Sequence, residues 1–479
     1  MKTIKYAAGL FGTAALFALA SGCGKKQDSA DASDPVTLTV WTYYNGDQLE
    51  SFNKLVDEFN SSVGKEKGIT VESYSQGTVN DLETNVLASA EGKVGASAMP
   101  NIFSAYADTA YTIDQMGQIV DLRSYFTDEE CAAYVDNYLE EGDFSGDGSI
   151  KIFPVAKSTE GLYLNETDWE PFATATGASY DDLSTLEGLV ATAEEYYNWT
   201  DAQTPEANDG HALFGRDAMA NYMLVGAKQL GCQIFEVKDG TMTLNFDKEV
   251  MRKLWDYYYV PYIKGYFASS GRFRSDDVKT GNILAYVGST SSASFFPSQV
   301  MTDDSEGHDI TMKVLPCPKF ADGEDYAVQQ GAGMVVTKSS DEETKACVEF
   351  LKWFTSPEHN IAFSVGSGYL PVTKEANDME QIEKSGLELS DSMKNILTGA
   401  VTTINSNQLY TTPAFSGAND ARSVLEYALS DIASADRATV AERLASGQSL
   451  ADATADFLSD SYFDSWYETT LAKLEAFQG

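Results

Sequence analysis

The first hundred residues show a regular succession of strand and helix patterns. Apolar and polar residues alternate over residues 36–42, which predicts a strand, and apolar residues recur every three to four positions over 49–63, which predicts a helix. The same order follows with a strand at 69–75, a helix at 79–91 and a strand at 100–107. Strands that alternate with helices indicate a mostly parallel sheet with helices on its faces.

The stretch 148–169, GSIKIFPVAKSTEGLYLNETDW, changes character in its middle. Its first part is strand-forming as far as Pro154, which offers no backbone N–H to a ladder. A polar run, KSTEG, separates it from a second apolar strand at 162–164. A strand that leaves one sheet and enters another would form a hinge between two lobes. An ordinary hairpin within one sheet is the alternative.

Residues 310–318 show the same strand-then-proline pattern and end in Pro316-Cys317-Pro318. We therefore predict hinge crossings at 154–157 and 315–318. Strands are also expected at 281–287 and 331–337, and the chain is expected to be helical from about residue 377. The predicted division is a first lobe of residues 36–154 and 317–360 and a second lobe of residues 155–316 and 361–479.

The N-terminus has the pattern of a lipoprotein leader. Residues 1–22 combine a positive start, an apolar core and small residues before Cys23, and the run is too short for a lasting transmembrane helix. Leu19-Ala20-Ser21-Gly22-Cys23 resembles the bacterial lipobox, in which the cysteine carries the lipid. Residues 23–35 would then be the lipidated cysteine and a flexible tether. A plain signal peptide with an incidental cysteine is the alternative.

Composition and charge narrow the class of protein. The 479 residues are 43% hydrophobic and 12% aromatic, which is typical of a folded protein with two or three domains. The formal net charge of -39, from 33 Lys and Arg against 72 Asp and Glu, excludes nucleic acid as a partner. We expect a monomer that contacts the membrane only through its lipid anchor.

Neither a metal site nor a cofactor site is predicted. The three histidines lie far apart, and the Asp143–Gly148 stretch resembles half of a calcium loop but has Pro154 where a bidentate Glu should stand. No cysteine pair has the CxxC spacing. Cys131, Cys232, Cys317 and Cys347 are interpreted as small buried residues, and disulfides among them stay open.

Several polar residues follow predicted strands. Tyr43, Asn45, Tyr106 and Asp108 fall at carboxyl ends of strands, where open α/β sheets bind ligands. The turn at 288–292, GSTSS, could present backbone N–H groups to sugar hydroxyls or to an anion. An ordinary serine N-cap is an equal alternative for it.

These pieces together resemble the extracellular solute-binding proteins of bacterial ABC importers, in the family of the maltose-binding protein. The resemblance rests on VWTYYN, MPNIFSAYAD, the hinge stretch, KTGNILAYVGSTSS, GAGMVVTKSSDEETKACVEFLKWFTSPE and GYLPVTKEA, in that order. It implies a two-lobe periplasmic-binding-protein-like α/β fold of type II. Each lobe would be a mostly parallel sheet flanked by helices, with a helical C-terminal section and ligand held between the lobes. An ABC permease on the outer face of the cytoplasmic membrane would be the partner.

LYLN, GSTSSAS and GYLPVTKEA are most similar to the glycerol-3-phosphate-binding members of this family. That resemblance implies ligand contacts at Ser158, Ser291, Gly331 and Tyr369.

Departures from the pattern argue against phosphate. Val79 stands where a tyrosine is expected, and Phe415 or another neutral residue of PAFSGAND stands where the phosphate-binding arginine is expected. Phosphate needs such a partner. Replacement by Arg272 or Arg274 is one alternative, and a surface role is the simpler interpretation for both.

We therefore predict a binding protein for a mainly uncharged carbohydrate, and not an enzyme. The alternative ligand is glycerol-3-phosphate or a glycerophosphodiester. A secreted glycoside hydrolase would need two carboxylates ~5–10 Å apart, and no motif fixes such a pair. A surface adhesin is disfavoured because the chain lacks repeats and a wall-sorting signal.

Overall fold

The computed structural model describes residues 35–238, 240–301 and 307–478. The predicted leader, Cys23 and all but the last residue of the tether lie outside the described residues. Among the described helices, none combines the length and the apolar sequence needed to cross a membrane.

The first lobe is built on a four-stranded sheet in the order β13-β3-β1-β2. Its strands are β1 (Val36–Thr42), β2 (Ile69–Ser75), β3 (Ile102–Ala105) and β13 (Gly333–Val336). β1 runs parallel to β2 and β3, whereas β13 runs antiparallel to β3. Alternation along β1 sends Leu38 and Val40 to one core and Trp41 to another, so both faces of the sheet are buried.

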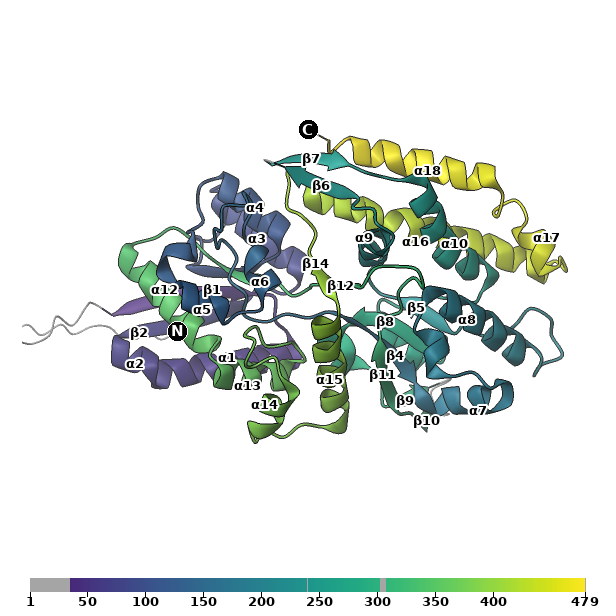
Figure 1. The fold of residues 1–479 in the computed structure, drawn as a ribbon, viewed down its shortest axis with the longest axis horizontal. Helices are drawn as coiled ribbons and strands as arrows, with labels where there is room; N and C mark the ends of the chain where they lie inside the picture. The colour runs from purple at the N-terminus through teal and green to yellow at the C-terminus, as the bar shows by residue number, and fades with distance from the viewer. Residues whose placement is uncertain (1–34, 239, 302–306, 479) are drawn as a thin grey trace, which may run out of the picture. The chain divides into compact units, whose positions relative to one another are not determined.

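Helices cover both faces of this sheet (Figure 1). They are α1 (Gly46–Ser61), α2 (Val63–Lys67), α3 (Val79–Ala90), α4 (Ala107–Gln115), α5 (Asp128–Ala132), α6 (Asp136–Glu140), α12 (Asp341–Phe354), α13 (Pro357–Ser367) and α14 (Met379–Lys384), with a 3₁₀ turn at Leu122–Tyr125. Phe52 and Phe59 of α1 are seven residues apart and so lie on the same face of the helix, where both rings contact Phe350 of α12. The periodic apolar face predicted for this helix is thus the face that joins the core.

The second lobe has a sheet in the order β11-β4-β8-β5. Its strands are β4 (Glu160–Asn165), β5 (Phe214–Arg216), β8 (Ala285–Ser289) and β11 (Met312–Pro316). Only the β5–β8 pair is parallel, and β4 runs antiparallel to both β8 and β11. The expectation of a mostly parallel sheet is therefore wrong for this lobe. Glu160, the first residue of β4, pairs with Ser289, the last residue of β8, so the two strands run in opposite directions.

Helices and two-stranded ribbons complete the second lobe. The helices are α7 (Glu166–Thr176), α8 (Leu186–Asp201), α9 (Met219–Gln229), α10 (Lys248–Lys264), α11 (Arg274–Lys279), α16 (Ala418–Ala445), α17 (Leu450–Thr454) and α18 (Asp460–Glu475), with 3₁₀ turns at Tyr180–Leu183 and Thr290–Phe295. The ribbons are β6 (Phe235–Lys238) with β7 (Thr241–Leu244), and β9 (Gln299–Met301) with β10 (Gly307–Asp309). The helical C-terminal section packs into the same core as β4 and β8.

The packing divides the chain differently from the predicted lobe boundaries. Ile361 and Phe363 of α13 and Ile382 of α14 join the core of the first lobe, although they were assigned to the second. Phe320 and Val328 pack in the second lobe, beyond the crossing predicted at 315–318. The apolar pattern of residues 357–384 is compatible with packing in either lobe. Only the tertiary structure shows which core they join. We propose that the return crossing lies at about residues 329–332.

Three elements lie between the two groups (Figure 1). α15 (Asp391–Ser406) packs on β11 and β4 of the second lobe, while its Leu397 joins the core of the first. β12 (Tyr326–Val328) pairs in parallel with β14 (Gln408–Tyr410) beside it. The lobes are thus linked by several adjacent segments of chain.

The predicted strand before Pro154 is a buried extended segment with only isolated bridges. Phe153 pairs with Met334 of β13, and no regular strand forms over residues 150–155. The four cysteines of the described chain, Cys131, Cys232, Cys317 and Cys347, form no disulfide with one another.

Candidate functional site

Two antiparallel bridges join the segments that run between the lobes. The Ser158 N–H donates to the Gln330 carbonyl at 2.9 Å, and the Gln330 N–H donates back at 2.8 Å. One residue earlier, Lys157 exchanges the same pair of backbone bonds with Leu370. Residues 157–158, 330 and 370 therefore meet at one point beside the cleft.

Lys157 is fully buried at this point. Its ammonium forms an ion pair with Glu141 and donates to the Gly331 carbonyl at 2.9 Å. A buried charge needs both an opposite charge and hydrogen bonds to offset the loss of water. This group ties the crossing segment to the end of α6 in the first lobe.

Three of the predicted tyrosines meet beside these crossings. The Tyr43 hydroxyl lies 3.1 Å from the Tyr369 hydroxyl, and the Tyr43 ring is stacked on the Tyr106 ring with centroids 6.4 Å apart. Tyr43 follows β1, Tyr106 precedes α4, and Tyr369 lies after α13. Burial raises the pKa of Tyr43 and Tyr369, so both hydroxyls are neutral hydrogen-bonding groups.

The serines come to the same place from the second lobe. Ser289, at the end of β8, donates to the Ser158 hydroxyl at 3.2 Å and lies 3.0 Å from the Ser291 hydroxyl. It also caps the 3₁₀ turn by accepting from the Ser291 N–H at 3.4 Å, as in the N-cap interpretation. Ser289 can therefore cap the turn and contact Ser158 at the same time, and Ser158 and Ser291 are both buried.

Asn45 and Gly331 have structural roles at the edge of this cluster. The Asn45 amide donates to the carbonyls of Tyr43 and Gly77 at 2.7 and 2.8 Å, and so holds the turn after β1. Gly331 has a φ of +90°, and a Cβ there would lie 2.7 Å from the Ala156 carbonyl oxygen. Only glycine allows the two crossing segments to approach this closely.

Asp108 lies in a cavity of about 300 Å³ that Tyr106 also lines. Burial raises the pKa of Asp108, and Arg422 opposes that shift. Glu83 of α3 shares the cavity, and burial together with the nearby Asp108 carboxylate raises its pKa to about 7. A second cavity of about 600 Å³ adjoins this one along Glu141 and residues 411–413.

Gln329 and Gln330, on the return crossing, line the same cavity. Gln329 is 6% exposed, yet neither its Oε1 nor its Nε2 finds a hydrogen-bond partner among the described residues. The Gln330 Oε1 is unpartnered in the same sense. An unpaired buried polar group costs about 1–3 kcal/mol, which a polar ligand or water could offset.

The prediction that the cleft lacks an arginine is wrong. Arg422 of α16 lines the cavity, next to Ala421, which is buried in the helix packing. Its Nη2 donates to the Asn221 Oδ1 at 2.7 Å, and the Asn221 amide donates to Glu160 at 2.7 Å. Glu160 is in turn paired with the buried Arg216. Phe415, the position considered for this arginine, is buried in the second core.

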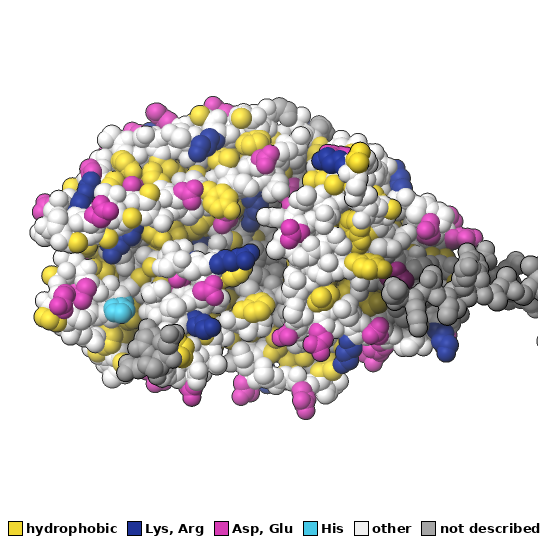
Figure 2. Space-filling view, turned by 180° about the vertical axis from the view of Figure 1, so that it is seen from behind, with side chains coloured by type: hydrophobic (Ala, Val, Ile, Leu, Met, Phe, Trp, Pro, Cys, Tyr) yellow, Lys and Arg dark blue, Asp and Glu magenta, His cyan; other side chains and the backbone are white. Residues whose placement is uncertain are grey.

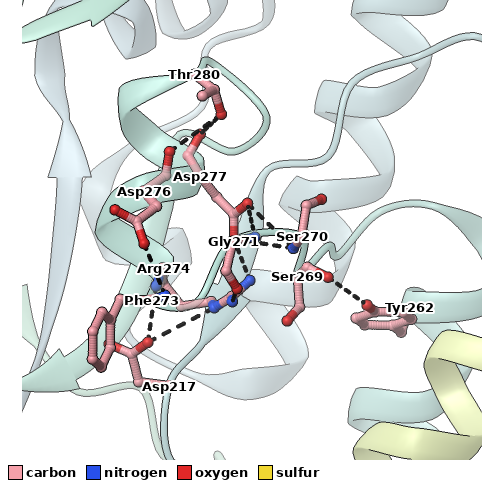
Figure 3. A network of polar contacts seen from close by, with 10 residues as sticks. All are labelled: Asp217, Tyr262, Ser269, Ser270, Gly271, Phe273, Arg274, Asp276, Asp277 and Thr280. Carbon is pink, nitrogen blue, oxygen red and sulfur yellow. Dashed lines mark hydrogen bonds and ion pairs between the residues drawn. The ribbon is translucent and has the colours of Figure 1, made fainter.

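Arg274 cannot replace that arginine, and its expected surface role is also wrong. It is 4% exposed and its guanidinium is paired with Asp277, while its backbone N–H donates to the Asp217 carboxylate at 2.9 Å (Figure 3). Both acids are held in one network with the 270–271 turn. Arg272 lies on the surface over the Phe273 ring. Neither arginine is among the residues that line the cavity beside Tyr106.

Of the residues that line the cavity, only Tyr106 and Asp108 were identified from the sequence as ligand contacts; those missed include Glu83, Asn221, Gln329, Gln330, Asn419 and Arg422. The adjacent glutamines directly before GAGMVVT were a usable signal, because a polar pair at the start of a buried strand is uncommon. Arg422 gave no signal, since any charged residue in the first turns of a long helix has the same appearance.

Acidic residues are scattered over the surface drawn in Figure 2, with lysine and arginine side chains interspersed among them. The large negative charge is therefore spread over this face, and the charges in the cavity must be considered by themselves.

Comparison with known proteins gives a consistent result. The sequence profile described as "Bacterial extracellular solute-binding protein" matches residues 54–387. No curated protein matches the sequence. The cyclic α-maltosyl-1,6-maltose binding protein of Arthrobacter globiformis superposes with a TM-score of 0.65 at 19% identity, over 92% of this chain and 100% of that one.

Two further solved structures are similar. UgpB of Mycobacterium tuberculosis, in complex with glycerophosphocholine, has a TM-score of 0.64 at 17% identity, over 92% of this chain and 98% of that one. An ABC substrate-binding protein of Listeria monocytogenes, in complex with cycloalternan, has a TM-score of 0.63 at 16% identity, over 92% and 100%. At these identities the likeness shows the fold, and the expected two-lobe fold is confirmed.

Proposed function

Because the chain belongs to the family of bacterial extracellular solute-binding proteins, we propose that it captures a carbohydrate between its lobes and delivers it to an ABC permease. Members of this family bind substrates and are not enzymes, so the chain is a binding protein and the glycoside-hydrolase alternative does not hold. Its place is extracytoplasmic, as the family description states.

The tyrosine cluster beside the cavity is the observation that carries this proposal. Aromatic rings offer apolar faces to sugar rings, while hydroxyl, amide and carboxylate groups pair with sugar hydroxyls. Here Tyr106 and Asp108 lie in one cavity with the unpartnered Gln329 amide. The adjoining cavity extends the cleft, which favours an oligosaccharide over a single ring.

The residues that line the cavity come from both lobes, which suggests how a ligand would close them. Tyr106, Asp108 and Glu83 belong to the first lobe, whereas Arg422 and Asn221 belong to the second. A ligand that touches both sets does so only when the lobes are closed, and it therefore shifts the population toward the closed state. Partners for the Gln329 amide would add to that differential affinity.

A thermal-shift screen tests the proposed ligand class. We expect at least one neutral or amine-bearing oligosaccharide to raise the melting temperature, because a ligand at 100 times its Kd adds about 2.7 kcal/mol of stability. The panel should hold maltotriose, N-acetylglucosamine and glucosamine trisaccharides, and glycerophosphocholine. A shift with glycerophosphocholine alone would contradict the carbohydrate proposal.

Arg422 gives a specific reason to keep a glycerophosphodiester as the second candidate. A guanidinium is the natural partner of a phosphate, and the earlier objection was that the cleft had none. Against it, Asp108 and Glu83 lie in the same cavity and would repel an anion at close range. Binding of glycerophosphocholine that Arg422→Gln abolishes would decide for this candidate.

We also propose that Cys23 carries a lipid anchor, as the LASGC sequence suggests. The change to test is Cys23→Ala, which should abolish incorporation of a clickable palmitate analogue in cells. Equal labelling of the wild type and of the variant would exclude Cys23 as the lipidated residue.

A further inference from the structure

The cavity beside Tyr106 carries an excess of negative charge. Its charged lining residues are Glu83, Asp108, Glu141 and Arg422. Glu141 is neutralised by its ion pair with the buried Lys157. Two carboxylates then face a single guanidinium, and that guanidinium is already bonded to the Asn221 amide.

Glu83 is the carboxylate that lacks a cation. No ion pair joins it to a lysine or arginine of the described chain, and its neighbour from α16 is the neutral Asn419 amide, 3.4 Å away. From α4 it faces the Thr109 hydroxyl and Asp108, a second acid whose carboxylate raises the pKa of Glu83. Even partial burial of a carboxylate without an opposite charge is unfavourable.

Gln329 supplies an independent sign of a polar ligand in this cavity. Both polar atoms of its side chain are buried and unpartnered among the described residues, and the residue is part of the cavity lining. One atom accepts a hydrogen bond and the other donates. A ligand that reached both atoms would need an acceptor, such as a sugar hydroxyl, and a donor, such as a hydroxyl or a protonated amine.

We propose that the ligand is an amino sugar whose protonated primary amine lies between Glu83 and Asp108. This inference rests on the proposed function and names the ligand class more narrowly. An ammonium group donates up to three hydrogen bonds, which suits two carboxylates and the Gln329 oxygen. A quaternary ammonium has no N–H and cannot make these bonds.

Proton release gives the proposal a readout beyond affinity. The pKa of Glu83 is raised to about 7 by burial and by Asp108, and an ammonium beside it would lower that pKa. Binding should then release protons near neutral pH, and affinity should rise as the pH increases through about 7. The rise should stop where the ligand's own amine loses its proton.

The test is calorimetry with glucosamine trisaccharide and with its N-acetylated counterpart, which keeps the rings and removes the charge. We expect the aminated sugar to bind at least about tenfold more tightly, and Glu83→Gln to abolish both that preference and the proton release. Glu91→Gln, at the exposed end of the same helix, is the matched control and should change neither.

Each other outcome contradicts the inference in a distinguishable way. Equal or tighter binding of the N-acetylated sugar or of maltotriose would overturn it and leave carbohydrate binding standing. Binding of glycerophosphocholine without any sugar would overturn both proposals. A preference for the amine that survives in Glu83→Gln and Asp108→Asn would show that the amine lies elsewhere.

Discussion

Replacing Lys157 by methionine is expected to lower the free energy of unfolding by about 3–5 kcal/mol, the usual cost of breaking a buried ion pair. The substitution keeps the length of the side chain but removes the charge. Glu141, whose side chain is 5% exposed, would be left without its cation, and the Gly331 carbonyl would lose its donor. The measurement is urea denaturation, followed by fluorescence and by circular dichroism to detect separate unfolding of the lobes.

Two further variants make the Lys157 result specific. Lys345→Met removes a lysine from an exposed i,i+4 pair with Asp341, and it should change stability by at most about 0.5 kcal/mol. Adding Glu141→Gln to Lys157→Met should recover part of the loss, because the buried charge is then gone. A Lys157→Met protein as stable as the wild type would show that this ion pair does not hold the crossing in place.

Elements defined by local patterns were predicted well from the sequence. β1 begins and ends at the predicted residues, since its alternation is strict and Tyr43-Tyr44-Asn45-Gly46 ends it. α3 ends one residue before the predicted end. In both cases the side chains that decide the structure are close in sequence, so the pattern is sufficient.

Features decided by distant contacts were not predictable in this way. The antiparallel pairing of β4 depends on where the chain enters the second lobe, which no local pattern records. The residues before Pro154 have strand-forming side chains but meet β13 at a single bridge. Local propensity therefore predicted a regular strand that does not form there.

The candidate site was predictable to the extent that it lies at strand ends. By that rule Tyr106 and Asp108 line one cavity and Tyr43 lies against Tyr106; the family resemblance pointed to Tyr369, which contacts Tyr43, and their role in binding stays a prediction. Arg422 enters from a helix more than three hundred residues after Tyr106 in the chain, so only the folded structure shows them around one cavity. Because Arg422 was not predicted, the sequence argued more strongly against a phosphate ligand than the structure does.

The proposed function requires that the ligand bind in the cavity beside Tyr106. The decisive measurement is calorimetry of wild type, Tyr106→Ala and Tyr427→Ala with the sugar that gives the largest thermal shift. Tyr106 lines the cavity and stacks on Tyr43, whereas Tyr427 is 60% exposed on α16. We predict that Tyr106→Ala weakens binding at least about tenfold and that Tyr427→Ala leaves it unchanged. Unchanged affinity in a folded Tyr106→Ala protein would contradict the proposal that this cleft holds the ligand.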